Sequence, residues 1–277
     1  MTPEAVAAGI LPEPTIQLTQ NQIEHYHREG YMVIEQISTP DEIEKLRVIY
    51  DRLFEQKAGR ADGAQFDLGG TDEEGKQAVL PQILNPVKYA PELTYGLFRA
   101  NGLAIAKQLL GPEAIANGEH AIFKPAIHGA ETPWHQDEAY WSPALDYNAF
   151  SLWMPLQPAR LDNGCMQFVP GSHRGEVLPH HSINHDPRIH GLEMDVVPGS
   201  DKAVACPLPA GGCTVHHNRT YHYTGPNRST LPRRAYILMF GLPAKKRTDN
   251  RRFPWEEIKQ TARTTRAEAT SKAATTA

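Results

Sequence analysis

The 277-residue sequence contains few cysteines and lacks a long apolar run. Its three cysteines, Cys165, Cys206 and Cys213, are odd in number and have no C-x-x-C spacing, which argues against a disulfide framework or a zinc ribbon. Reduced, buried thiols in a cytoplasmic protein are the simplest interpretation. No apolar run approaches the roughly 18 residues of a membrane-spanning helix, and the first residues lack the features of a secretory signal. We therefore expect no membrane contact.

The sequence also has no excess of positive charge, since 28 Lys and Arg stand against 32 Asp and Glu, for a net charge of −4. This balance gives no electrostatic basis for binding nucleic acid or an acidic membrane. The length is sufficient for one large domain or two small ones. Proline (23) and glycine (21) are frequent, which favours many strands and turns over a helical bundle.

The first part of the chain predicts helices with at least one strand. Residues 1–18 are interrupted by proline and are expected to form an irregular arm. Thr19 and Gln22 occupy the two positions of a capping box, and Gly30 marks the end of that helix. Apolar periodicity and capping residues predict helices over 19–29, 39–59 and 91–110, and a strand over 31–34. The polar stretch 59–77 reads as a surface loop.

After Gly118 the pattern changes to short apolar runs between turn residues, which indicates a sandwich or jelly roll. Strands are expected over 120–127, 133–138, 149–156, 165–169, 193–197, 203–207, 213–217 and 234–240. Asp162-Asn163-Gly164 predicts a hairpin between two of them. We thus predict one domain over 19–245, with helical support over 19–118 and a β core over 119–245. Residues 246–277 are polar without an apolar face and are expected to be a disordered tail.

The most informative stretch is Trp134-His135-Gln136-Asp137. On a strand, residues i and i+2 point to the same side, so His135 and Asp137 can bind one metal ion together. By itself this spacing is weak evidence, because 13 histidines make it common by chance. Two histidines and one carboxylate on one side of an iron ion, with open positions opposite, is the arrangement of non-haem Fe(II) oxygenases.

The second histidine is expected late in the chain, where His216, His217 and His222 are candidates. His216 and His217 read as a strand pair with one side chain inward and one outward. His222 is favoured because Arg233 follows eleven residues later. A 2-oxo acid that chelates iron needs a fixed cation for its far carboxylate, and the planar fork of arginine suits that task. Arg234 is the alternative, since adjacent strand residues face opposite sides.

Three motifs in order resemble the phytanoyl-CoA dioxygenase family of Fe(II)- and 2-oxoglutarate-dependent oxygenases. They are His135-x-Asp137, Asn163-Gly164-Cys165-Met166-x-x-x-Pro170-Gly171-Ser172-His173, and His222-x-Thr224-x-x-Asn227-x-Ser229-x-x-x-Arg233. None is specific alone, but together they cover about residues 20–245. The resemblance implies a cupin-like double-stranded β-helix, a jelly roll with supporting helices, and a small-molecule substrate.

The resemblance also assigns roles by position. His135, Asp137 and His222 match the metal ligands, Arg233 matches the arginine that holds 2-oxoglutarate, and Thr224 matches a hydroxyl that assists it. Further pocket positions match Trp153, Lys124 and Gln82. Trp153 reads equally well as a core aromatic residue, and Lys124 as a strand residue that extends to solvent.

The implied reaction uses Fe(II), O2 and 2-oxoglutarate, and hydroxylates or oxidatively desaturates the substrate with release of succinate and CO2. The carboxylate of Asp137 favours these outcomes over halogenation, for which related enzymes carry a small residue there. Two alternatives stay open: a non-catalytic metal- or ligand-binding jelly roll, and a hydroxylase of partner proteins.

Two polar stretches, 59–77 and 179–191, are expected to cover the pocket and to order on substrate binding. The histidines of the second stretch have irregular spacing, which favours a loop over a zinc site.

Overall fold

The computed structural model describes residues 11–276, and its N-terminal helices begin and end at the expected capping residues. In α2 (Gln20–Glu29) the Thr19 hydroxyl accepts from the Gln22 amide and the Gln22 side chain accepts from the Thr19 amide. Gly30 ends the helix at φ 79°, a conformation that glycine adopts without strain. Thr39 caps α3 (Pro40–Glu55). The third predicted helix is divided at Gly96 into a 3-10 helix and α4 (Leu97–Leu110).

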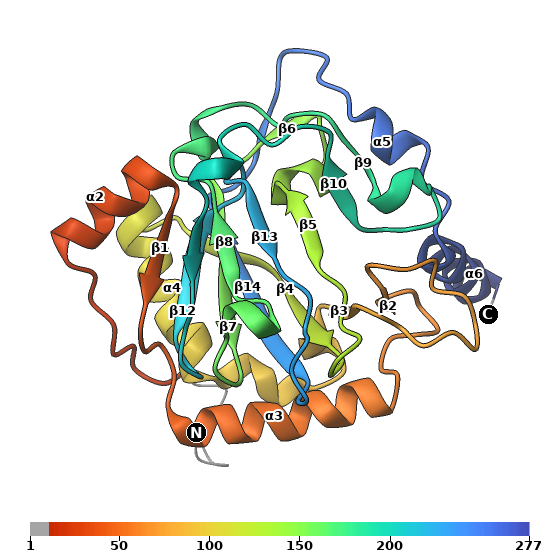
Figure 1. The fold of residues 1–277 in the computed structure, drawn as a ribbon, viewed down its shortest axis with the longest axis horizontal. Helices are drawn as coiled ribbons and strands as arrows, with labels where there is room; N and C mark the ends of the chain where they lie inside the picture. Colours follow the sequence, from red (N-terminus) through yellow and green to blue (C-terminus); the bar gives the residue numbers. More distant parts are fainter. Residues whose placement is uncertain (1–10, 277) are drawn as a thin grey trace.

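Most strands belong to two antiparallel sheets (Figure 1). In spatial order, the major sheet contains β1 (Tyr31–Ile34), β12 (Cys213–His217), β7 (Ala149–Pro155), β14 (Arg233–Gly241), β4 (Ile115–Lys124), β3 (Pro81–Leu84) and β2 (Gln65–Asp67). The minor sheet contains β11 (Val204–Cys206), β8 (Met166–Phe168), β13 (His222–Thr224) and β5 (Thr132–His135). Two short pairs complete the β structure: β9 (His180–Ser182) with β10 (Leu192–Met194), and β6 (Leu145–Asp146) with β15 (Lys245–Lys246). Antiparallel sheets with supporting helices fit the jelly-roll prediction.

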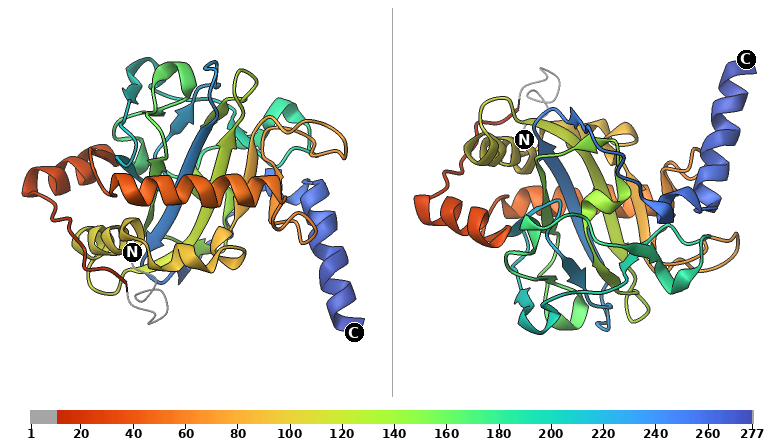
Figure 2. Two further views of the ribbon diagram at one scale, coloured as in Figure 1. Left: turned by 90° about the horizontal axis from the view of Figure 1, so that it is seen from below. Right: turned by 90° about the horizontal axis from the view of Figure 1, so that it is seen from above.

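The two faces of the major sheet have different neighbours because strand side chains alternate. Leu152 and Met154 of β7 belong to the core shared with α3 and α4, which lie across one face of the sheet (Figure 2). Trp153, between them, packs in a second core with Met166 and Phe168 of the minor sheet. The inner faces of both sheets thus enclose the space in which a ligand site can form.

The predicted hairpin at 162–164 is wrong, because β7 and β8 lie in different sheets. The segment instead forms a 3-10 turn that carries the chain from one sheet to the other. Gly164 adopts φ 85°, and the Asn163 side chain accepts from the Arg160 amide and donates to the Pro158 carbonyl. Asn-Gly therefore marks a sharp turn, as its chemistry predicts, but not a hairpin. The sequence also missed β2, which lies inside the predicted loop 59–77.

The predicted disorder of 246–277 is wrong for the residues that the structure describes. That segment contains α5 (Pro254–Glu257) and α6 (Ala262–Thr276), which extends from the body in Figure 2. Phe253 and Trp255 are buried against Ala139 and Leu192. No apolar periodicity marks α6 in the sequence, because polar groups anchor this helix.

The anchors of α6 reach the 59–77 stretch. Arg263 Nε donates to the Gly63 carbonyl at 3.0 Å and Arg266 Nε to the Arg60 carbonyl at 2.9 Å. Arg266 also forms an ion pair with Asp72. Hydrogen bonds to carbonyl oxygens and one carboxylate thus replace the apolar face that a surface helix usually buries.

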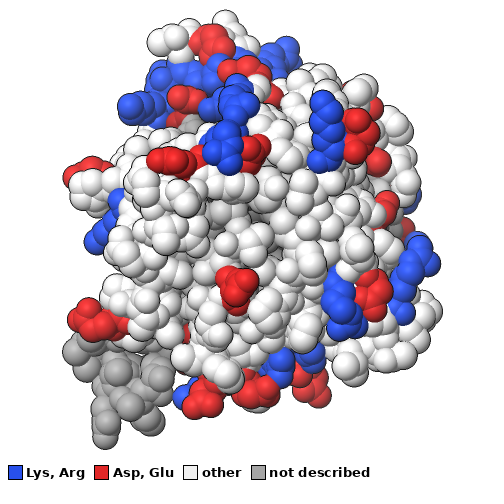
Figure 3. Space-filling model, turned by 60° about the vertical axis from the view of Figure 1, so that its left-hand side comes forward, with Lys and Arg blue, Asp and Glu red and all other residues white. Residues whose placement is uncertain are grey.

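All three cysteines are buried and free of disulfides, as the sequence indicated. Among the described helices, none is both long and apolar enough to cross a membrane. On the face drawn in Figure 3, basic and acidic side chains lie beside one another around a largely uncharged centre.

We predict that Arg266→Ala releases α6 without unfolding the sheets. Hydrogen bonds to charged groups contribute roughly 1.5–3 kcal/mol, so the amides of 262–272 should exchange about tenfold faster or more. Hydrogen exchange followed by mass spectrometry measures this effect. Arg252→Ala is the matched control, because it removes a largely exposed ion pair with Glu257 from the same segment. Unchanged exchange in the Arg266 variant would contradict this account of the anchoring.

Candidate active site

His135, Asp137 and His222 converge between the two sheets. Their potential ligand atoms all lie within 4.8 Å of one another. His135 and His222 are direct partners across the β5–β13 pair, with ring centroids 4.0 Å apart. Asp137 comes after the end of β5, at the start of a 3-10 helix, whereas the sequence predicted continuous strand. Because Gln136 keeps extended backbone angles (φ −120°, ψ 132°), Asp137 still faces the same side as His135.

Hydrogen bonds to the backbone orient both imidazoles. His135 Nδ1 lies 2.7 Å from the Pro133 carbonyl oxygen, and His222 Nδ1 lies 2.9 Å from that of Thr220. A carbonyl only accepts, so each Nδ1 carries the proton and each Nε2 keeps its lone pair. The Nε2 atoms of His135 and His222 lie 3.8 Å and 3.4 Å from Asp137 Oδ1. Two imidazole nitrogens and one carboxylate oxygen are a suitable donor set for Fe(II).

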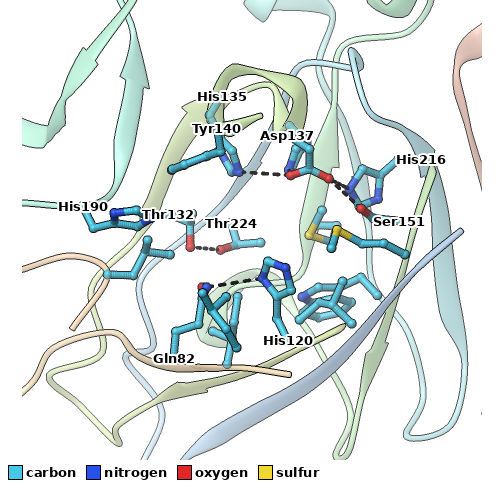
Figure 4. A pocket seen from close by; sticks show the side chains of 18 of the residues that line it. Gln82, His120, Thr132, His135, Asp137, Tyr140, Ser151, His190, His216 and Thr224 are labelled. Carbon is cyan, nitrogen blue, oxygen red and sulfur yellow. Dashed lines mark hydrogen bonds and ion pairs between the residues drawn. The ribbon is translucent and has the colours of Figure 1, made fainter. Parts of the chain in front are cut away.

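Other side chains hold the second oxygen of Asp137. Ser151 Oγ donates to Asp137 Oδ2 at 2.6 Å, and His216 Nε2 lies 3.4 Å from the same atom (Figure 4). Burial raises the pKa of the Asp137 carboxyl, but His222 and His216 outweigh burial and hold that pKa well below its usual range. Burial, and next the proximity of His222, holds the pKa of His135 well below its usual value. The carboxylate is therefore ionised and His135 is neutral, which are the protonation states that metal binding requires.

Arg233 lines the same cavity, which has a volume of about 350 Å³. It begins β14, and its guanidinium lies over the Trp153 ring at 5.2 Å from the centroid. Arg233 is fully buried, yet its Nε and Nη1 have no hydrogen-bond partner among the described residues. Burial lowers the pKa of Arg233 to about 9, so the group still carries its charge at neutral pH. A buried, unpaired guanidinium is costly unless an anion joins it.

Arg234 faces the opposite side of the sheet. Its guanidinium binds Asp51 of α3 at 2.6 Å and lies over the Phe123 ring. Alternation along β14 thus directs Arg233 into the cavity and Arg234 toward the helices. Arg233, and not Arg234, is therefore placed to contact an anion in the cavity.

The other predicted pocket residues have different surroundings. Thr224 and Trp153 line the cavity, and the Thr224 hydroxyl donates to that of Thr132 at 3.0 Å. Gln82 lines it as well, and its amide lies 3.3 Å from His120 Nδ1. Lys124 is fully buried but is not part of the lining.

The Lys124 ammonium instead donates to the carbonyl oxygens of Thr224 and Gly225, at 3.1 Å and 2.7 Å. Lys124 thus braces the segment that carries Thr224.

Sequence reasoning missed several lining residues. Ser151, His120 and Tyr140 carry no motif, and His216, a less favoured candidate for the second metal-binding histidine, lies instead beside the second oxygen of Asp137. Alternation along 149–156 and 120–127 would have placed Ser151 and His120 on inner faces, but it did not indicate a role. The two covering stretches are both present at the cavity, where they contribute Leu68 and His190.

We predict that Ser151 positions Asp137 for metal binding. Ser151→Ala leaves Oδ2 without its shortest hydrogen bond, so the affinity for Fe(II) should fall about tenfold or more, as for other residues that orient metal ligands. Anaerobic iron titration measures it, and Ser151→Thr should restore much of the affinity because it keeps the hydroxyl. Ser182→Ala is the control, since the Ser182 hydroxyl is buried in another strand without a hydrogen-bond partner among the described residues. Equal iron affinity in the two alanine variants would refute the role.

Among known proteins, the chain is similar to several dioxygenases and related proteins. The chain is 27% identical over 222 residues to a probable alpha-ketoglutarate-dependent hypophosphite dioxygenase of Stutzerimonas stutzeri, covering 78% of this chain and 76% of the relative. It is 24% identical to phytanoyl-CoA dioxygenase domain-containing protein 1 of Bos taurus, covering 80% of this chain and 89% of the relative.

A solved structure, EvdO2 from Micromonospora carbonacea var. aurantiaca complexed with 2-oxoglutarate, superposes with a TM-score of 0.74. It is 37% identical and the match covers 88% of this chain and 99% of EvdO2. Residues 26–235 match the profile of the family described as phytanoyl-CoA dioxygenase, which is most of the chain. The chain therefore belongs to the phytanoyl-CoA dioxygenase family.

Proposed function

We propose that this protein is an Fe(II)- and 2-oxoglutarate-dependent dioxygenase with a double-stranded β-helix core. It hydroxylates, or oxidatively desaturates, a small molecule and releases succinate and CO2. The observation that carries the proposal is the buried Arg233, whose Nε and Nη1 are unpaired in the cavity that also contains the metal-binding triad. A metal site alone has no need of this cation, but a chelating 2-oxo acid with a second carboxylate does.

Different residues of the site would bind the metal and the co-substrate. His135, Asp137 and His222 would hold the iron from one side and leave its other positions open. Fe(II) and 2-oxoglutarate, when bound, supply the activation of O2 coupled to decarboxylation. Arg233 would bind the far carboxylate of the co-substrate, with the Thr224 hydroxyl beside it.

Apolar side chains border the polar groups of this site. Trp153 covers one side of the Arg233 guanidinium, and the lining includes the apolar side chains of Ile122, Ile237 and Met239. Removing water from the cavity strengthens the ion pair between co-substrate and arginine and protects reactive species from side reactions. The hydrogen bond from Ser151 holds the Asp137 carboxylate in one orientation.

The two alternatives are less well supported. A non-catalytic jelly roll that binds only a metal leaves the unpaired nitrogens of Arg233 unexplained, and one that binds a ligand would be distinguished by the absence of succinate formation. A hydroxylase of partner proteins needs a groove that admits a polypeptide, whereas a cavity of about 350 Å³ is at the small end for ligand pockets. Three buried free thiols support the proposal that the protein works in a reducing compartment such as the cytoplasm.

We predict that Arg233→Ala raises the dissociation constant for 2-oxoglutarate at least tenfold, because truncating one member of a buried charged pair costs roughly 2–5 kcal/mol. Arg233→Lys should recover part of the affinity, since lysine lacks the two-pronged geometry. Titration at fixed iron occupancy measures the effect. Arg234→Ala is the matched control, as it removes the neighbouring guanidinium from the other face. A large loss in the Arg234 variant alone would overturn the assignment.

We predict that His222→Ala abolishes stoichiometric Fe(II) binding and the turnover of 2-oxoglutarate to succinate. The reason is that only His135 and Asp137 would remain as ligands, too few for a tight site. Iron content and succinate formation are measured together. His217→Ala, a change on strand β12 of the major sheet, should keep both. Iron loss in the His217 variant with iron retained in the His222 variant would disprove the ligand assignment.

A further inference from the structure

The C-terminal segment contributes two charged side chains to the cavity. Glu256 of α5 and Arg263 of α6 both line it, although they come from a part of the chain far from the sequence motifs. The segment is held close by Trp255, whose indole donates to the Ala139 carbonyl at 3.0 Å, and by Arg251, which binds Glu138 at 2.6 Å. Glu138 directly follows the metal ligand Asp137, so the segment is attached to the site itself.

Arg263 is fixed in place but keeps donors available. Its guanidinium lies over the Phe66 ring at 4.7 Å from the centroid, and its Nε donates to the Gly63 carbonyl. These contacts use the flat face of the group and one of its five N–H donors. Within residues 11–276, neither terminal nitrogen of Arg263 has a hydrogen-bond or ion-pair partner, whereas Arg266 on the same helix is paired with Asp72.

The other charges of the cavity already have partners. Asp137 is surrounded by the histidines and Ser151, and the carboxylate of Glu256 accepts from Lys259. The proposed function assigns Arg233 to 2-oxoglutarate. Burial and the nearby Arg266 lower the pKa of Arg263, and Glu256 opposes this shift without forming an ion pair with Arg263 among the described residues. The terminal nitrogens of Arg263 therefore stay available to an anion that the triad and the co-substrate do not supply.

Arg263 also lies at the end of the cavity opposite the residues that hold Asp137. Phe66 contacts Arg263 with its face and lies 4.9 Å from the His190 ring in an edge-to-face arrangement. In Figure 4, His190 is across the cavity from Ser151 and His216, which hold Asp137. A substrate that contacts Arg263 would thus extend from the Phe66–His190 end toward the metal-binding triad.

We propose that Arg263 binds an oxyanionic group of the substrate, a carboxylate or a phosphoryl group, and that the substrate is a compact molecule with an apolar body. This inference rests on the proposed function and names the substrate class of the same site. The planar guanidinium pairs with two oxygens of either anion, and the apolar lining receives the rest of the molecule. The C-terminal segment then contributes to the specificity for the substrate.

The test uses holoenzyme loaded anaerobically with Fe(II) and saturating 2-oxoglutarate, so that Arg233 is already occupied. Calorimetry measures the binding of hexanoate, hexylphosphonate and hexanamide, which share an apolar chain and differ in charge. Wild-type protein should bind one or both anions at least tenfold more tightly than the amide, and the stronger anion identifies the oxyanion class. Arg263→Gln should remove this preference, leave amide binding unchanged and leave the affinity for 2-oxoglutarate unchanged.

Two further variants test whether the preference depends on the Arg263 guanidinium. Arg252→Gln removes a largely exposed ion pair with Glu257 from the same segment, outside the cavity, and should keep the preference for anions. Arg263→Lys keeps the positive charge and should keep part of the preference for anions. The inference is overturned if wild-type protein binds the three probes equally or binds none of them. It is also overturned if Arg252→Gln loses the preference as fully as Arg263→Gln. Failure of wild-type protein to bind 2-oxoglutarate would instead refute the proposed function.

Discussion

A charged guanidinium buried between two sheets is the constraint on which the site depends. Arg233 has no counter-ion among the described residues, and its neighbour across the β14–β4 pair is Lys124, a second buried cation. Lys124 is satisfied by two carbonyl oxygens, whereas Arg233 keeps two nitrogens unpaired. Burial of an unpaired charge destabilises the fold, so it persists where a ligand supplies the missing charge. The folded protein is thus prepared for an anion.

Alternation along the strands lets one sheet serve both stability and chemistry. On β14, Tyr236 and Leu238 join the core beneath the helices, while Arg233 and Ile237 face the cavity. On β7, Ser151 faces the cavity and holds Asp137, while its neighbour Leu152 is a core residue. A shift of register by one residue would exchange the two sets, so the packing of the helices also fixes the orientation of the site.

The C-terminal segment shows a different principle, because polar contacts hold it beyond the buried Phe253 and Trp255. Arg251 reaches Glu138, and Arg266 reaches Asp72 and the Arg60 carbonyl. Such contacts gain less free energy than a buried apolar face, so they can open more easily. This wall of the cavity can therefore move more readily than the sheets that carry His135 and His222.

The sequence by itself determined the local structure and the site motifs. Capping residues located α2, apolar runs located most strands, and the spacing of His135 and Asp137 predicted a metal site, because these signals depend on neighbours in the chain. Only the tertiary structure decided which of Arg233 and Arg234 faces the cavity, since the apolar run 235–240 has no alternation to set the register. The partners of Asp137, the placement of Lys124 and the docking of α6 likewise depend on contacts between distant segments. Sequence periodicity cannot predict such contacts, because they join residues that are far apart in the chain. A serine hydroxyl binds a carboxylate in one case, and an arginine binds a backbone carbonyl in another.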